Sequence, residues 1–303
     1  MPRINSLWIG MKTAVGVSDG GTDSQLVLIV NEGGEPVDAV HATLPDTSQS
    51  DQEEGQANLY RIELNDETPR EGRTFDTQDL NPSSIRVGIR GDDRWSPGSC
   101  LVWGQDAQGS IVPLALNVVR QGFEAGEPPT MALSTDPDEG RTSFCVKRVQ
   151  PGDEFTAVSR LILLVATADE DDAGTDDTIT LRITDIFGRV LVEETIADTV
   201  QDDLEQGQAN FYYVEFGATV IRTNLDDKSI QLSINGDDAW RPASVFLFGL
   251  DAREGETVNF VTPLVHLPEW PFGTLSTDSG EGRASVALPV VHTTSGPATS
   301  PRP

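Results

Sequence analysis

The sequence predicts an all-β protein built as two tandem antiparallel β-sandwiches, and three observations support this prediction. The chain repeats itself in order, its apolar segments have the length and the two-residue period of strands, and turns rich in Gly, Asp and Asn separate them. We find no segment with a strong helical period. Several short strands between such turns are typical of a β-sandwich in each half of the chain.

The repeat is visible in three pairs of short segments. GQANLY at 55–60 returns as GQANFY at 207–212, GDDRWSP at 91–97 returns as GDDAWRP at 236–242, and LSTD at 133–136 returns at 275–278. The order is kept while the spacing between copies shrinks, so we expect the second copy to have shorter loops. We therefore predict a first sandwich at 1–150, a second at 151–292 and a disordered tail at 293–303, which is composed mainly of Thr, Ser, Gly and Pro.

Strands are expected at equivalent places in the two copies. Continuous apolar runs occupy 26–30 and 161–166, and apolar residues alternate with others at 85–90, 178–183 and 230–235. The segments 100–103 and 245–248 are apolar on both faces. Turns are expected at 31–36 and at the two Gly-Asp-Asp sequences.

The alignment of the copies also predicts where the cysteines lie. Cys100 aligns with Val245 and Cys145 aligns with Ala287, so we expect both cysteines to be small buried hydrophobic residues rather than a redox pair. Two cysteines are too few for a disulfide framework or a cysteine zinc site.

The tryptophans fall into two groups. Trp95 and Trp240 occupy equivalent positions after an acidic turn, so we expect them to fill the two cores rather than to insert into a membrane. Trp270 lies in the segment PEWPF at 268–272 and is the better candidate for an exposed apolar tip.

The net charge restricts the possible partners. The chain has 49 acidic and 21 basic residues, which gives a formal charge of -28. Such a chain repels nucleic acid and anionic membranes and attracts cations. No apolar run has the roughly 20 residues of a membrane span, and the N-terminus lacks the features of a signal peptide. We expect a cytoplasmic protein, with export by a leaderless route left open.

Three acidic loops occur in each copy, and alternate loops of a sandwich collect at one end. The second copy has them at 172–177, 202–205 and 237–238, and the first has them at 19–23, 50–54 and 92–93. Carboxylates held close together repel one another unless a divalent cation neutralises them, and calcium prefers such oxygen ligands. The alternative is that Asp and Gly simply form good turns. Ser50 replaces a carboxylate, so we expect a weaker site in the first copy.

These residues resemble the PLAT (lipoxygenase homology) family of β-sandwich domains, which bind membranes or protein partners. The matching features are AGTD at 173–176, DLEQG at 203–207 before an aromatic strand, and the alternating strand 230–234 that leads to Trp240. The second copy is most similar to the calcium-dependent phospholipid-binding domains of clostridial alpha-toxins. The resemblance implies calcium ligands at Asp172, Gly174, Thr175, Asp202, Asp203, Asp238 and the carbonyl of Ala239, with Asp19, Gly21, Thr22, Asp51 and Asp93 in the first copy.

The sequence favours binding over catalysis. It contains no nucleophile elbow, zinc-binding helix or phosphate-binding glycine loop, although a pair of catalytic carboxylates stays open as an alternative. We expect a non-enzymatic calcium-binding module that acts as a protein-binding adaptor or a structural component of a larger assembly. The alternative is a calcium-dependent module that docks on a phospholipid membrane. The charge favours the adaptor, because an anionic membrane would repel this chain over about 8 Å.

Overall fold

The structure is a computed structural model, and it describes residues 2–16, 20–33, 38–45, 52–67, 71–118, 132–196, 203–251 and 258–292. Asp19, Ser50, Asp51, Asp202 and the tail at 293–303 lie outside the described residues, so the predictions for them stay predictions. The described chain is composed of β-strands and two short 3-10 helices, which confirms the all-β prediction. No helix among these residues is long and apolar enough to span a bilayer.

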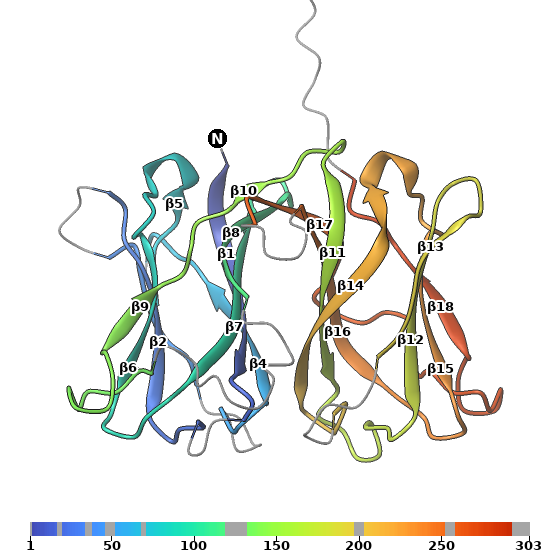
Figure 1. The fold of residues 1–303 in the computed structure, drawn as a ribbon, viewed down its shortest axis with the longest axis horizontal. Coiled ribbons are helices and arrows are strands. Elements are labelled where there is room, and N and C mark those ends of the chain that lie inside the picture. Colours follow the sequence, from blue (N-terminus) through green and yellow to red (C-terminus); the bar gives the residue numbers. More distant parts are fainter. Residues whose placement is uncertain are drawn as a thin grey trace, which may run out of the picture.

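The two copies contain corresponding elements in the same order, except that β5 of the first copy has no separate counterpart in the second (Figure 1). Those of the first copy are β1 (Arg3–Thr13), β2 (Gln25–Val30), β3 (Val40–Thr43), β4 (Ala57–Glu63), β5 (Phe75–Asp76), η1 (Thr77–Asp79), β6 (Ile85–Arg90), β7 (Pro97–Asp106), β8 (Ile111–Asn117) and β9 (Ser143–Cys145). A short β10 (Gln150–Pro151) follows. Those of the second copy are β11 (Ala157–Thr167), β12 (Thr178–Thr184), β13 (Val190–Ile196), β14 (Ala209–Ile221), η2 (Arg222–Asn224), β15 (Ile230–Asn235), β16 (Pro242–Leu250), β17 (Phe260–Leu267) and β18 (Ser285–Leu288).

Each copy has a four-stranded outer sheet. The strand order is β3-β2-β6-β9 in the first copy and β13-β12-β15-β18 in the second, and neighbouring strands are antiparallel. The expected alternation is present, because Ile179, Leu181 and Ile183 of β12 point into the core between its exposed or half-buried neighbours. The outer sheets therefore have one face on a core and one towards solvent, as in a sandwich.

The inner strands of both copies join into one sheet with the order β10-β17-β16-β11-β14-β4-β1-β7-β8. The join between β14 and β4 is a single antiparallel pair, Ala209 with Ala57. At the other side β10 pairs with β17 in parallel, and the bridge between Ala115 of β8 and Arg148 brings the segment before β10 beside β8. The inner strands of the two copies thus form a nearly closed ring (Figure 1).

Three apolar clusters follow from this arrangement. One fills the first sandwich and one fills the second, and Trp95 and Trp240 are fully buried in them as expected. The third lies inside the ring, between the inner strands of the two copies, and contains aromatic residues from both, among them Trp8, Trp103 and Phe246. Strands β7 and β16 are apolar on both faces because each contacts its own core on one face and the other copy on the opposite face.

Two predictions about single residues are wrong. Cys145, the last residue of β9, is exposed because it lies between the buried Phe144 and Val146 and therefore points away from the core. The small residue at the aligned position shows only that little space is filled there, not that the position is buried. Trp270 is half-buried and packs against the second core, with its ring edge-on to Phe272 at 5.0 Å, so it is not an exposed tip.

Candidate functional site

The three predicted acidic loops of the second copy meet at one end of its sandwich. The loop 172–177 leads into β12, the loop at 203–207 leads into β14, and the turn at 236–239 follows β15 (Figure 1). Gly174 lies against the second of these loops, since a methyl group on it would be 3.2 Å from the carbonyl oxygen of Leu204 and 3.1 Å from the amide nitrogen of Gln206. Glycine is needed here because two backbones approach each other closely.

Asp238 connects the first loop to the third. Its Oδ2 accepts a hydrogen bond from the amide of Asp176 (3.1 Å), and its own carbonyl accepts one from the hydroxyl of Thr175 (3.5 Å). The amide of Asp238 donates in return to Oδ2 of Asp177 (2.6 Å). Asp238 and Thr175 are thus brought together as predicted, and Ala239 donates its amide to Oδ1 of Asp238 (3.1 Å).

Asp203 is buried in the second loop, whereas Asp172 is exposed at the start of the first. Oδ1 of Asp203 accepts a hydrogen bond from the side-chain amide of Asn210 (2.9 Å). The next residue, Leu204, has a positive φ of 65°, and its amide donates to Oδ1 of Asn210 (3.1 Å). Asn210 therefore fixes the turn in which Asp203 lies, a role that its place in the repeated GQAN sequence did not reveal.

A buried threonine and tryptophan hold the second loop on the sandwich. Thr167, at the end of β11, donates its hydroxyl to the carbonyl of Leu204 (3.0 Å) and accepts a hydrogen bond from Nε1 of Trp240 (3.0 Å). Thr13 does the same in the first copy, between the carbonyl of Gln52 (3.1 Å) and Nε1 of Trp95 (2.9 Å). The tryptophans thus have a polar role beside their packing, which the sequence analysis missed.

The first copy repeats the loop contacts almost one by one. Asp93 accepts a hydrogen bond on Oδ2 from the amide of Asp23 (2.7 Å), and its carbonyl accepts one from the hydroxyl of Thr22 (3.1 Å). A methyl group on Gly21 would lie 2.9 Å from the carbonyl oxygen of Gln52, which has a positive φ of 64°. The cluster of loops is therefore a property of the repeat and not of one copy.

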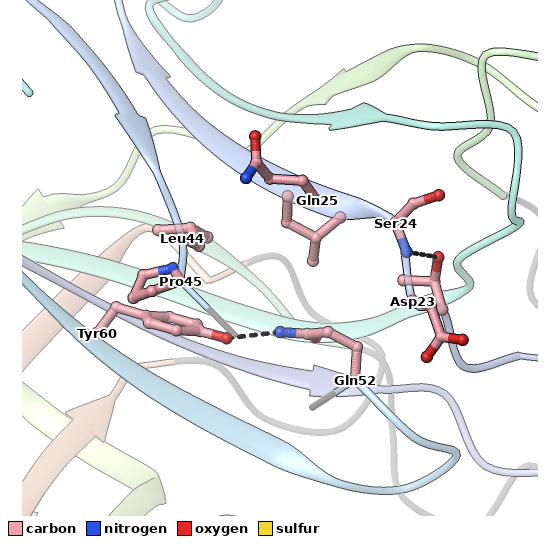
Figure 2. Close-up of a pocket in the computed structure, with 9 residues that line it drawn as sticks. Asp23, Ser24, Gln25, Leu44, Pro45, Gln52 and Tyr60 are labelled. Carbon is pink, nitrogen blue, oxygen red and sulfur yellow. Dashed lines mark hydrogen bonds between the residues drawn. The ribbon is translucent and has the colours of Figure 1, made fainter. Parts of the chain in front are cut away.

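The two copies differ in what lies under the second loop. In the first copy Gln52 replaces Leu204, and its side-chain amide donates to the hydroxyl of Tyr60 (2.8 Å). A hollow of about 200 Å³ opens beside this pair, lined also by Thr22, Asp23, Ser24, Gln25, Leu26, Leu44 and Pro45 (Figure 2). In the second copy Leu204 belongs to the apolar core instead.

A lysine from the first copy reaches the acidic loops of the second. Lys12 of β1 is buried, and burial lowers the pKa of its ammonium group, while the nearby carboxylate of Asp203 acts in the opposite direction. In the second copy the position of Lys12 is taken by Ala166. Asp203 thus has a nearby positive charge that the sequence alone did not suggest, because it comes from the other copy.

The described residues do not by themselves make a metal site. Among them no three side chains of His, Cys, Asp or Glu lie together in a way that could hold a metal ion. One of the four predicted carboxylates of the second copy, Asp202, and two of the three in the first, Asp19 and Asp51, lie outside the described residues. The oxygens of Asp238, Asp203 and Thr175 have the right chemistry for calcium, but each already takes part in a hydrogen bond.

Comparisons with known proteins show a weak structural likeness. No family model matches the chain, and a search of curated proteins finds no match. Among solved structures, alpha toxin from Clostridium absonum is similar with a TM-score of 0.32 and 20% sequence identity. The match covers 45% of this chain and 33% of the toxin chain.

Proposed function

We propose that the protein is a non-enzymatic docking module made of two PLAT-like sandwiches, which binds calcium at its acidic loops and joins a protein partner there as an adaptor. The observation that carries the proposal is the repeated loop cluster. Both copies build it with the same hydrogen bonds, and both clusters lie at the same end of the molecule (Figure 1). A loop cluster that is present in both copies and faces the same direction in both is expected of a contact surface.

Calcium would be held by the residues that the resemblance implies, with Asp172, Asp203 and Asp238 as the acidic ligands of the second copy. When bound, it would supply positive charge to loops that are otherwise strongly acidic. The ranges 169–177, 203–207 and 236–241 contain ten acidic residues and one basic residue. Lys12 already offsets part of this charge at Asp203, so we expect calcium to bind the second copy less tightly than the number of carboxylates alone would predict.

The acidic end suits a protein partner better than insertion into a membrane. Of the large apolar side chains that are exposed among the described residues, only Val15 lies near these loops, and it is 37% exposed. Membrane insertion would need apolar side chains at the tips, whereas a protein partner can be bound through polar and charged contacts. Two linked clusters would also strengthen binding to a partner that offers two matching sites.

Thermal unfolding in calcium and in chelator, at constant ionic strength, tests the calcium site. Binding to the folded state alone at a hundredfold excess over Kd adds about 2.7 kcal/mol of stability, which corresponds to a rise in Tm of roughly 5 °C for a chain of this size. Asp238→Asn keeps a side-chain oxygen for the amide of Asp176 but removes the charge, so it should abolish the rise.

Asp237→Asn is the matched control, because Asp237 is the exposed neighbour in the same turn and is not an expected ligand. The rise in Tm should survive in this variant. Identical melting temperatures of the wild type in calcium and in chelator would contradict the calcium proposal.

A second candidate function is calcium-bridged docking on an anionic membrane. It is favoured by one observation, that both loop clusters lie at the same end and could touch one flat surface together (Figure 1). Co-sedimentation with phosphatidylserine vesicles in calcium, lost in chelator and in Asp238→Asn, would select this function over the adaptor. Sedimentation that does not depend on calcium would argue against it.

A further inference from the structure

The end of the second sandwich opposite the acidic loops exposes large apolar side chains. Phe155, in the turn before β11, is 66% exposed, and Phe187, in the turn between β12 and β13, is 77% exposed. Ile186 is 50% and Val190 is 44% exposed beside Phe187. These four residues, which we call the apolar end, include the two most exposed large hydrophobic side chains among the described residues.

The two turns lie on either side of η2 (Figure 1). The amide of Thr223 donates to the carbonyl of Glu154 (3.1 Å), and the amide of Ile186 donates to the carbonyl of Asn224 (2.9 Å). Consecutive residues of η2 thus tie one turn to the other. The two phenylalanines therefore belong to one surface of the molecule.

The same type of hydrogen bond, from the phenylalanine amide to an aspartate side chain, shapes the turn that carries each phenylalanine. Oδ1 of Asp153 accepts the amide of Phe155 (2.9 Å), and Oδ1 of Asp185 accepts the amide of Phe187 (2.9 Å). Asp185 also accepts two hydrogen bonds from Arg189. The aspartates are used to shape the turns, so the phenylalanines project from ordered backbone.

At the turn of the first copy that can be compared directly, the position of Ile186 has no apolar side chain. The amide of Gly33 donates to the carbonyl of Asp79 (2.7 Å), which is the counterpart of the bond between Ile186 and Asn224. Gly33 thus lies where the second copy has Ile186. At this described position the apolar side chain is therefore particular to the second copy and is not required by the fold.

The size and shape of the apolar end argue against a second copy of this chain as the partner that binds there. The four side chains expose together roughly 400 Å² if a phenylalanine offers about 200 Å². That is half of the roughly 800 Å² that each partner of a stable complex buries. A phenylalanine that exposes 77% of its surface also projects outward instead of lining a groove for a partner helix.

The charge around the apolar end is close to balanced. The ranges 153–156, 185–190 and 222–228 hold five acidic and three basic residues, in contrast with the opposite end. The last eleven residues, 293–303, contain no large apolar side chain that could cover the patch. Projecting aromatic side chains on a nearly neutral surface are suited to the interface of a zwitterionic lipid bilayer, which neither attracts nor repels the chain by charge.

We propose that Phe155 and Phe187 anchor this protein to a zwitterionic lipid surface, without calcium, through the end of the molecule opposite the acidic loops. The acidic end then faces away from the lipid and stays free for its own partner. The two contacts are independent, because they lie at opposite ends and use different chemistry. The lipid contact does not depend on the proposed calcium site.

Co-sedimentation of the full chain with phosphatidylcholine vesicles, in chelator, tests this proposal. The wild type should pellet with lipid, and Phe155→Ser or Phe187→Ser should each weaken the partition about tenfold, because each removes a largely exposed phenyl ring from the bilayer interface. The double variant should remain in the supernatant. Val15→Ser, which changes an exposed apolar residue at the acidic end, is the matched control and should pellet like the wild type.

Far-UV circular dichroism and Tm identify any variant that has lost its fold. Asp238→Asn should pellet normally, so failure of the calcium site would leave this result unchanged. A folded wild type that stays in the supernatant at millimolar lipid would overturn the proposal, as would a folded double variant that pellets like the wild type. A wild-type dimer that the double variant converts to a monomer would assign the surface to self-association instead.

Discussion

The cluster between the two inner sheets makes a strong prediction about Trp103. Its side chain is fully buried and stacks on Trp8 with ring centroids 6.3 Å apart and an angle of 8° between the planes. Its ring also lies 5.1 Å from Phe246 and 5.1 Å from Phe248, both from the other copy. Trp103 therefore links the copies, and Trp103→Ala should loosen the contact between them.

The size of the effect follows from two opposing contributions. Truncating a buried tryptophan to alanine costs about 3–5 kcal/mol through lost contacts and the cavity left behind. The indole N–H of Trp103 has no hydrogen-bond partner among the residues that the structure describes, and removing a buried unpaired donor returns part of that cost. We expect a net loss of about 3 kcal/mol in the free energy of unfolding.

Urea unfolding followed by circular dichroism and tryptophan fluorescence measures this loss. Because both sandwich cores remain intact, Trp103→Ala should keep its β-sheet spectrum in buffer. The urea concentrations at which the first and second copies unfold should differ more in this variant than in the wild type. Trp95→Ala is the matched control, since Trp95 is equally buried but lies in the first core. Trp95→Ala should destabilise the first copy more than the second. A loss below about 1 kcal/mol for Trp103→Ala would refute the reasoning.

Three further predictions concern side chains that titrate or react. Burial, with a smaller effect of the nearby Arg61, lowers the pKa of His266 to about 4. The unfolded state therefore binds more protons than the folded state between about pH 4 and 6.5, so the free energy of unfolding should rise with pH through this window. In urea titrations His266→Phe should flatten this rise. A thiol reagent should label Cys145 in the native protein and reach Cys100 only in denaturant, because Cys100 is buried and burial raises its pKa. Lys12→Met should strengthen calcium binding at the second copy in calorimetric titrations, and unchanged affinity would contradict the electrostatic role of Lys12.

The sequence predicted the parts of the fold that depend on local patterns. Alternation of apolar and other residues located β12 and β15, and the aligned positions of Trp95 and Trp240 placed both in a core. These predictions succeeded because a strand with one buried face must alternate, and because a residue type kept in both copies of a repeat often reflects the shared core.

The contact between the copies was not predicted, although a signal for it was present. The segments at 100–103 and 245–248 are apolar on both faces, a pattern typical of strands covered on both sides. Nothing local says which surface covers the second face. The error at Cys145 has a related cause, since alignment compares residue sizes but not the direction in which an edge strand points its side chains.

The candidate site was predicted as a group of loops but not in its details. The three loops were correctly expected at one end of the sandwich, where Gly174 contacts the second loop and Thr175 the third, because turn residues in a repeat mark loops at the ends of strands. The partners that hold these loops, Thr167 and Asn210, lie in strands and show no pattern of their own. Long-range hydrogen bonds of this kind follow from the fold and not from neighbouring residues.

The nearly closed ring of inner strands has a consequence for how the chain can be divided. Each copy covers, with its own inner sheet, an aromatic face of the other that would otherwise meet water. A fragment that ends near residue 150 would expose Trp8 and Trp103, and the remaining fragment would expose Phe246 and Phe248. Neither half is therefore expected to persist as a monomer, and loss of one copy would leave the other in need of a new partner for the same face.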